Sequence, residues 1–498
     1  MSMGWGFGDG YSSAARPTLP GERGAVSAAH PLAVAAGQAM LFKGGSAVDA
    51  AIAAQATLCV VSPDACGLGG DLFALVGDGG GVIAVNGAGA APLGLTQASG
   101  DGATSVTVPG LAGGWAAMHD RWGRLALADC LAPAIRLAEH GHRICASVAR
   151  AAVAQHDRLV RNGAAGWALC GLCEGDVLIQ PALGAALRQM GQHGAGWFYH
   201  GDAAAAIARA VAAGGGALAV ADLSAHATEL ADPIAVSYRG CEVLVQPSPT
   251  QGILLAMALQ GLAHCSPGDD ASAEHLCVEL TEAAFAYRDR AADGASLLDE
   301  ALTINPDRAS LRGGPRAYLH TAGVATADAD GLVVSSLVSL FDDFGSCVFV
   351  PELGITLNNR AGGFTGGANA AGPGKRPVHT LAPAMLRRPG RDGPDLLALA
   401  TPGADGQVQT LLQVIDRIVR RGEDLARAIA APRWRSEGGA LLIEESHPAR
   451  PALAARGHNL APLPDGQMRF GALACAGLSG GQPLAVADWR RENWAGVA

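Results

Sequence analysis

Thr321 lies about two-thirds along this 498-residue chain, between a helix-and-loop segment and two predicted strands. If the bond between His320 and Thr321 were cut, Thr321 would carry both a hydroxyl nucleophile and a free α-amine. A threonine hydroxyl is weakly nucleophilic at neutral pH and needs a proton acceptor, which an amine with a pKa near ~8 can provide. A lone threonine before a strand is more often an ordinary strand-edge residue, so the chemistry depends on the surrounding sequence.

Short blocks of glycine, proline and charged residues follow one another along most of the chain. The first is Gly-Gly-Ser-Ala-Val-Asp-Ala-Ala at residues 44–51. The others occupy residues 61–63, 67–71, 108–110, 122–124, 131–134, 238–240, 247–249, 287–290, 344–346, 354–359, 373–376 and 401–403. In this order, from about residue 25 to 434, they resemble the γ-glutamyltransferase (γ-glutamyltranspeptidase) family of N-terminal-nucleophile hydrolases. Its precursors cleave themselves just before the threonine that matches Thr321, so the resemblance implies His320 and Thr321 as the cleavage site.

The segments that must position Thr321 alternate between helical and strand patterns. Helical spacing predicts helices within residues 28–61, where a glycine turn at residues 44–45 separates two helices, and within 112–230, 270–299, 407–421 and 425–431. Alternating or β-branched runs predict strands at residues 72–76 and 82–85, joined by a hairpin turn at 79–81, and at 333–340, 348–350, 355–357 and 396–401. Residues 307–316 have the polar, glycine-containing composition of an exposed loop. These patterns alone indicate an α+β protein. The family resemblance implies an αββα sandwich, in which helices flank two stacked antiparallel sheets.

The same resemblance divides the chain at Thr321. We expect an N-terminal tail at residues 1–24, a large subunit at 25–320 and a small subunit at 321–498 that begins with Thr321. Both subunits would form one intertwined domain, a heterodimer of self-cleaved halves whose further oligomerisation is left open.

The composition restricts the partners of the protein. With 49% apolar residues and a net charge of −10, the chain is globular and has no basic run suited to nucleic acids or anionic membranes. Small-molecule substrates are therefore expected. The first ten residues lack a basic region followed by an apolar core, and no apolar run is long enough to span a bilayer, so a cytoplasmic location is expected.

No cofactor or metal is expected. The eleven cysteines have no framework spacing, which suits a reducing compartment. Cys170 and Cys173 form a lone C-x-x-C pair without a second pair, and we interpret them as structural thiols.

Three further residues complete the catalytic group that the resemblance implies. Ser339 stands where the family has a second threonine whose hydroxyl orients the nucleophile. Gly403 and Ala404 match the glycine pair whose backbone N–H groups form the oxyanion hole, and alanine keeps the backbone donor.

The residues that hold a glutamyl group in the family are changed here. The family's carboxylate-binding arginine is missing from residues 85–92. Phe341, Arg360 and Gly363 replace the residues that bind the α-ammonium, and neither a phenyl ring nor a guanidinium accepts a hydrogen bond from an ammonium.

The pair of serines that binds the carboxylate becomes His379 and Thr380. Glutathione is therefore a poor candidate substrate. Arg360 beside His379 favours an acyl group that bears a carboxylate, since a guanidinium matches two carboxylate oxygens. The alternative is that Arg360 points outward as a surface charge. Residues 364–371 are shorter than the family's lid loop, which predicts an open site.

The primary functional prediction is a self-processing threonine hydrolase that cleaves an amide with a non-glutamyl acyl group through an acyl-enzyme. Oxamate amidohydrolase-like and cephalosporin acylase-like relatives have such specificities. Three alternatives stay open: hydrolysis of a C–C bond to an oxalyl-type group in natural-product biosynthesis, a genuine γ-glutamyl hydrolase or transpeptidase, and an uncleaved, non-catalytic binding homologue.

Overall fold

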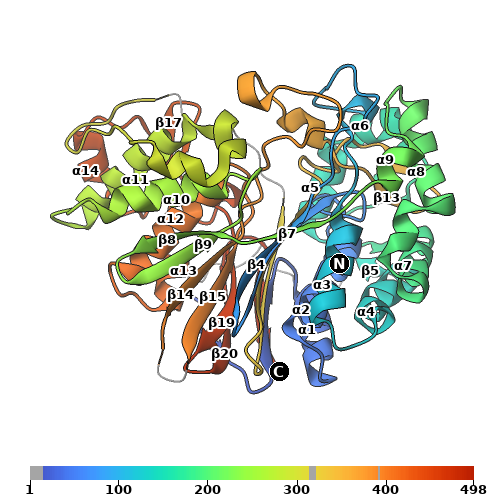
Figure 1. The fold of residues 1–498 in the computed structure, drawn as a ribbon, viewed down its shortest axis with the longest axis horizontal. Helices are drawn as coiled ribbons and strands as arrows, with labels where there is room; N and C mark the ends of the chain where they lie inside the picture. Colours follow the sequence, from blue (N-terminus) through green and yellow to red (C-terminus); the bar gives the residue numbers. More distant parts are fainter. Residues whose placement is uncertain (1–14, 313–320, 391–392) are drawn as a thin grey trace, which may run out of the picture.

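Two seven-stranded sheets lie face to face at the centre of the molecule, with helices on both outer sides (Figure 1). The computed structural model describes residues 15–312, 321–390 and 393–498. All strand pairs within these two sheets are antiparallel. The arrangement confirms the predicted αββα sandwich.

The first sheet follows the order β1 (Leu19–Pro20), β20 (Gln482–Ala487), β19 (Ala474–Ser479), β15 (Pro394–Ala400), β14 (Ala384–Pro389), β9 (Cys241–Val245) and β8 (Ile234–Tyr238). The second follows the order β21 (Trp494–Val497), β2 (Gly24–Ala28), β10 (Ala322–Asp328), β11 (Val333–Ser339), β3 (Asp71–Asp78), β4 (Gly81–Gly87) and β7 (Glu229–Ala231). Both sheets combine strands from before and after Thr321, so the two parts of the chain share both sheets.

One helical layer covers the second sheet, on the right in Figure 1. It contains α1 (Pro31–Phe42), α2 (Ala47–Val61), α3 (Leu111–Trp122), α4 (Leu127–His140), α5 (Ala146–Ala154), α6 (His156–Leu159), α7 (Pro181–His193), α8 (Gly201–Ala213) and α9 (Val220–Ser224). Helix α2 is buried along its whole length, and Ser46 begins it by accepting a hydrogen bond from the Asp49 amide. The predicted glycine turn at Gly44–Gly45 separates α1 from α2, as expected.

The other helical layer covers the first sheet, on the left in Figure 1. It contains α10 (Gly252–Ala263), α11 (Asp270–Phe285), α12 (Gly406–Val419), α13 (Leu425–Ala430) and α14 (Arg450–Ala455). The helix expected at residues 270–299 is shorter than predicted. It ends at Phe285 and a 3-10 segment, η5 (Arg288–Asp299), follows, in which Gly294 has a φ of 62° that an α-helix cannot contain.

Small sheets lie outside the sandwich. They are β5 (His142–Arg143) with β6 (Val177–Leu178), β12 (Phe349–Val350) with β13 (Ile355–Thr356), and β16 (Trp434–Glu437) with β17 (Ala440–Glu444) and β18 (Leu460–Leu463). Within the described ranges, none of the helices has both the length and the apolar character needed to cross a membrane.

The hairpin that follows Thr321 lies in the middle of the second sheet. β10 and β11 are buried at every position because helices cover one face and the first sheet covers the other. Apolar side chains such as Ala325, Leu396 and Ala476 fill the space between the sheets. Thr321 therefore directly precedes a strand that is buried at every position.

Candidate active site

Thr321 lies at the start of β10, and only 4% of its surface is exposed. Its Oγ donates a hydrogen bond to Ser339 Oγ at 3.4 Å, and Ser339 is the last residue of β11. Antiparallel pairing brings the two residues together, because Ala322 lies opposite Val338 in the register. A side chain at Gly323 would meet the carbonyl oxygen of Ala400 at 2.8 Å, so glycine lets β10 pack closely on β15.

The segment after β15 turns sharply at the two residues proposed for the oxyanion hole. Gly403 has a φ of 124° and Ala404 a φ of 48°. The carbonyl of Gly403 accepts hydrogen bonds from Gly406 N at 2.8 Å and Arg435 Nη1 at 3.2 Å. The carbonyl of Ala404 accepts from Gln251 Nε2 at 2.7 Å. The Gly403 carbonyl shares a peptide plane with the Ala404 N–H, so these hydrogen bonds also fix the direction of the Ala404 amide.

The N–H groups of Gly403 and Ala404 are free to donate. Among residues 15–312, 321–390 and 393–498, neither amide has a hydrogen-bond acceptor. Pro402, immediately before them, lines the same cavity as Thr321. Two adjacent amides of this kind are what an oxyanion hole requires.

A buried charged cluster lies beside Ser339. Asp71, the first residue of β3, pairs with Ser339 across the sheet. Asp71 Oδ2 accepts hydrogen bonds from Arg360 Nε at 3.1 Å and from His379 Nε2 at 3.2 Å. Because Leu381 N donates to His379 Nδ1 at 3.2 Å, the imidazole is neutral with its proton on Nε2.

Arg360 is fully buried, which excludes the outward-pointing alternative. Its Nη1 and Nη2 atoms, and Asp71 Oδ1, have no hydrogen-bond partner in the described part of the chain. Phe341 lies against the guanidinium, with 4.5 Å between Arg360 Cζ and the ring centroid. Buried polar atoms are nearly always paired, so two terminal nitrogens without a partner among the described residues suit an additional acceptor.

The protonation states in this cluster follow from burial and charge. Burial, and then the charge of Arg360, lower the pKa of His379 to about 4, so the imidazole is neutral near pH 7. Burial alone would raise the pKa of Asp71, but the His379 hydrogen bond and the Arg360 charge bring it below its ordinary value. Burial lowers the pKa of Arg360. An ionised Asp71 thus faces a cationic Arg360.

Backbone strain is concentrated around Thr321. Phe341 has a φ of 90°, Ala404 of 48° and Arg491 of 58°, values that residues other than glycine rarely adopt. Phe341 N donates to Ser339 Oγ at 2.9 Å, which helps to hold this conformation. Such strain is common at catalytic sites, where the surrounding fold stabilises it.

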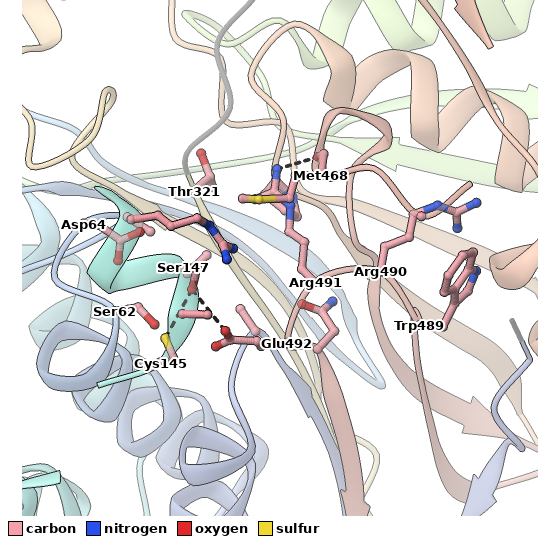
Figure 2. Close-up of a pocket in the computed structure, with 18 of the residues that line it drawn as sticks. Ser62, Asp64, Cys145, Ser147, Thr321, Met468, Trp489, Arg490, Arg491 and Glu492 are labelled. Carbon is pink, nitrogen blue, oxygen red and sulfur yellow. Dashed lines mark hydrogen bonds between the residues drawn. The ribbon is translucent and has the colours of Figure 1, made fainter. Parts of the chain in front are cut away.

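A cavity of about 770 Å³ opens beside Thr321 (Figure 2). Its lining carries three cationic and three anionic side chains, namely Arg150, Arg490, Arg491, Asp64, Glu174 and Glu492. Burial and the neighbouring Arg435 lower the pKa of Arg491 to about 10. In Figure 2, Cys145, Ser147 and Glu492 form a hydrogen-bonded row on the cavity wall, with Ser147 Oγ donating to Glu492 Oε1 at 3.1 Å. The cavity therefore suits a polar ligand.

The predicted acyl-binding residues lie outside this cavity. Arg360, His379, Thr380, Phe341 and Gly363 are buried and do not line it. The site was expected to be open, and around Arg360 this expectation is wrong for the uncut chain, because Phe341 covers the guanidinium. On the opposite side of Thr321 the cavity is open, as expected. His320, the other half of the predicted cleavage site, lies outside the described residues.

Two predicted residues contribute backbone rather than side chains. The Thr380 carbonyl accepts a hydrogen bond from Gln251 Nε2 at 2.6 Å. The Gly363 carbonyl accepts from Asn369 Nδ2 at 2.8 Å. Gly363 closes the 3-10 turn η6 (Arg360–Gly363) that begins with Arg360.

Three residues with roles at the site were not identified from the sequence alone: Asp71, Gln251 and Arg435. Gln251 fixes both Ala404 and Thr380, and Arg435 fixes Gly403. A buried arginine needs a nearby carboxylate, so Asp71, in the block at residues 67–71, could have been proposed as the partner of Arg360. No local pattern indicated Gln251 or Arg435.

Two groups of side chains have the residue types of metal ligands. His30, Cys145 and Glu492 bring donor atoms within 4.8 Å of one another, as do His275, Glu279 and His458. In the first group, Leu32 N donates to His30 Nδ1, so Nε2 holds the proton and has no lone pair for a metal. In the second, His275 and His458 hydrogen-bond directly at 2.8 Å. Both groups are explained by hydrogen bonding.

The sequence and fold were compared with known proteins. The family model for gamma-glutamyltranspeptidase matches residues 33–498. An acylase ACY 1 proenzyme of Pseudomonas sp. (strain SE83) is 33% identical over 95% of this chain and 93% of its own length. An oxamate amidohydrolase proenzyme of Klebsiella pneumoniae is 34% identical over 82% of this chain and 84% of its own.

A solved structure has the same fold. The crystal structure of a cephalosporin acylase from Bacillus halodurans superposes with a TM-score of 0.89 and 29% identity, covering 99% of both chains. Together with the match over residues 33–498, this similarity means that the chain is a hydrolase or acyltransferase that belongs to the gamma-glutamyltranspeptidase family of N-terminal-nucleophile enzymes.

Proposed function

We propose that this protein is a self-processing hydrolase in which Thr321 cleaves amides of short acyl groups that carry a carboxylate. The observation that carries the proposal is the fully buried Arg360, whose two terminal nitrogens have no partner among the described residues and lie beside the Asp71–Ser339–Thr321 contacts. The names of the acylase and amidohydrolase relatives agree with an amide substrate that is not γ-glutamyl.

The first step is cleavage of the chain itself. Thr321 Oγ attacks the carbonyl carbon of His320, the C–N bond breaks, and the acyl part moves to Oγ as an ester. Water then hydrolyses the ester, which leaves a carboxyl group on His320 and an α-amine on Thr321. Ser339 Oγ, at 3.4 Å from Thr321 Oγ, orients the attacking hydroxyl.

Turnover repeats this chemistry on a substrate. The free α-amine of Thr321 takes the proton of Oγ as Oγ attacks the amide carbonyl, and later gives that proton to the departing amine. The N–H groups of Gly403 and Ala404 stabilise the tetrahedral oxyanion. Water then attacks the acyl-enzyme and releases the acid, so one water is consumed for each amide cleaved.

Arg360 selects the acyl group. Its Nη1 and Nη2 atoms offer two parallel donors, a geometry that matches the two oxygens of a carboxylate. Since Phe341 covers the guanidinium at 4.5 Å, the ring has to turn aside for the acyl group to reach it. The leaving amine would occupy the polar cavity of about 770 Å³ on the other side of Thr321.

Intact mass and a denaturing gel of the purified protein beside a Thr321→Ala variant test this proposal. We expect two fragments that meet between His320 and Thr321 in the wild type and one chain in the variant. The processed protein should then hydrolyse oxalyl or dicarboxylic monoamides, and an Arg360→Gln variant should raise KM for these amides while it still cleaves itself.

A single uncut chain in both samples would favour a binding protein and overturn the hydrolase. Transfer of γ-glutamyl groups from glutathione at a rate comparable with dicarboxylic monoamides would overturn the role of Arg360 alone.

A further inference from the structure

A buried carboxylate on α11 fastens the segment that leads to the proposed cleavage site. Residues 300–312 have no regular secondary structure, and Arg312 is the last described residue before Thr321. Glu279, whose side chain is fully buried, accepts hydrogen bonds from this segment. The donors are Ser310 N at 2.8 Å, Ser310 Oγ, Asn305 N at 3.4 Å and Arg312 Nη1 at 3.3 Å.

His275, one turn earlier on α11, extends the same anchor. Its Nε2 faces the carbonyl oxygen of Asn305 at 2.9 Å and must therefore be the donor. Its Nδ1 then accepts the Nε2 proton of His458 at 2.8 Å. Ala309 N donates to Arg456 O at 2.9 Å, so residues on both sides of Thr321 in sequence hold the segment.

The contacts of Glu279 keep its carboxylate charged and hold residues 303–312 in place. Burial alone would raise the pKa of Glu279, but the Ser310 and Asn305 hydrogen bonds and the Arg312 charge lower it, so the carboxylate is ionised. Arg312 also donates Nη2 to the Thr303 carbonyl at 2.5 Å, which closes residues 303–312 into a loop. The segment before Thr321 is thus held by a buried, ionised carboxylate.

The anchor lies close in sequence to the proposed cleavage junction. Eight residues lie between Arg312 and Thr321, and the nine Cα–Cα steps that join these two residues span at most about 30 Å when extended. We propose that Glu279 is a positioning residue for self-cleavage. By fixing Ser310 and Arg312 in the precursor, it limits the chain conformations from which Thr321 Oγ can attack the His320 carbonyl, and it continues to hold Ser310 and Arg312 after cleavage. This inference rests on the self-cleavage proposed above.

Self-cleavage of full-length Glu279→Gln tests the inference. Glutamine keeps the shape of the side chain but removes its charge and one acceptor. Hydrogen bonds to charged groups are worth enough that we expect the first-order rate constant of cleavage to fall about tenfold or more. It is measured by the appearance of the two fragments after synthesis of the precursor. The kcat and KM of the processed fraction should equal those of the wild type, since Glu279 does not contact the nucleophile.

Asp307→Asn is the matched control. Asp307 is exposed in the same segment and its side chain makes no hydrogen bond or ion pair with the described residues, so its cleavage rate should be that of the wild type. Ser310→Ala, which removes one donor to Glu279, should slow cleavage less than Glu279→Gln. The cleavage rate of Ser310→Ala tests the same contact if Glu279→Gln does not fold.

The outcomes separate the two proposals. If the wild type does not cleave, self-processing itself fails. If the wild type cleaves and neither Glu279→Gln nor Ser310→Ala slows it, the positioning role is wrong. A fall in kcat of the processed enzyme that equals the fall in the cleavage rate would also overturn it, because that pattern indicates a general structural defect.

Discussion

Ser339 connects the two chemical parts of the site. Its hydroxyl contacts Thr321 and the Phe341 amide, and its neighbour across the sheet is Asp71, which holds Arg360. One residue thus contacts the proposed nucleophile directly and lies next to the proposed specificity group.

Ser339→Ala should lower kcat without an equal change in KM. The variant loses one hydrogen bond to the reacting hydroxyl, worth about 0.5–1.5 kcal/mol, which corresponds to about a twofold to tenfold slower reaction. Steady-state kinetics of the processed enzyme measure the change. Ser339→Thr keeps the hydroxyl and serves as control; an equally large loss in that variant would contradict this role of the hydroxyl.

Removal of either partner of the Asp71–Arg360 pair should destabilise the protein strongly. A buried charge left without its partner costs about 3–5 kcal/mol, so Asp71→Asn and Arg360→Met should each lower the free energy of unfolding by about that amount. The double variant should lose about 1–3 kcal/mol less than the sum of the two. Urea unfolding in a Thr321→Ala background, which keeps the chain in one piece, measures these values.

The exposed pair Lys43–Asp129 is the control for that cycle, since both side chains are 52% exposed. Asp129→Asn should change the free energy of unfolding by less than about 1 kcal/mol. Strict additivity of Asp71→Asn and Arg360→Met would mean that the two residues do not stabilise each other.

At the scale of elements, close packing between the sheets positions Thr321. β10 approaches β15 at Gly323, two residues after Thr321, and β15 leads into the turn at Gly403 and Ala404. We therefore expect the separation of these two strands to set the separation of the proposed nucleophile and the proposed oxyanion hole.

Gly323→Ala should disturb both stability and catalysis. The new Cβ would meet the Ala400 carbonyl at 2.8 Å, so the strands must separate, at a cost of about 1–3 kcal/mol in the free energy of unfolding. The cleavage rate should fall as well. Gly79→Ala adds the same methyl group where no atom lies within 4 Å and should leave both quantities unchanged. Wild-type cleavage in Gly323→Ala would contradict the proposed spacing.

Local patterns predicted most elements but not their register. The glycine turn at residues 44–45, the hairpin at 79–81 and the strand pair after Thr321 depend on neighbouring residues, and all were confirmed. The pairing of Asp71 with Ser339 joins distant segments, and a shift of one residue would turn Asp71 to the other face. The burial of Arg360 likewise depends on tertiary packing, which periodicity does not encode.

At the scale of the whole molecule, buried neutral histidines make stability depend on pH. Burial lowers the pKa of His30 and His379 to about 4. Between pH 6.5 and 4 the unfolded chain binds protons that the folded chain excludes, so stability falls as the pH is lowered through this window.

His379→Gln should flatten this dependence. In the wild type, His379 contributes a slope of up to about 1.4 kcal/mol per pH unit to the free energy of unfolding within the window. The variant should lose that contribution, as measured by urea unfolding at pH 7.5, 5.5 and 4.5. His264→Gln changes an exposed histidine and should retain the full slope. Identical slopes in wild type and His379→Gln would show that His379 is protonated normally in the folded state.

The placement of β21 has a consequence for the timing of events during biosynthesis. β21 pairs with β2, which in turn pairs with β10, and Arg490, Arg491 and Glu492 line the cavity beside Thr321. A nascent chain in which residue 321 has emerged from the ribosome but residues 489–497 have not lacks these neighbours. Thr321 therefore acquires its complete surroundings only after residues 489–497 have emerged, so we expect the proposed self-cleavage to follow translation of these residues.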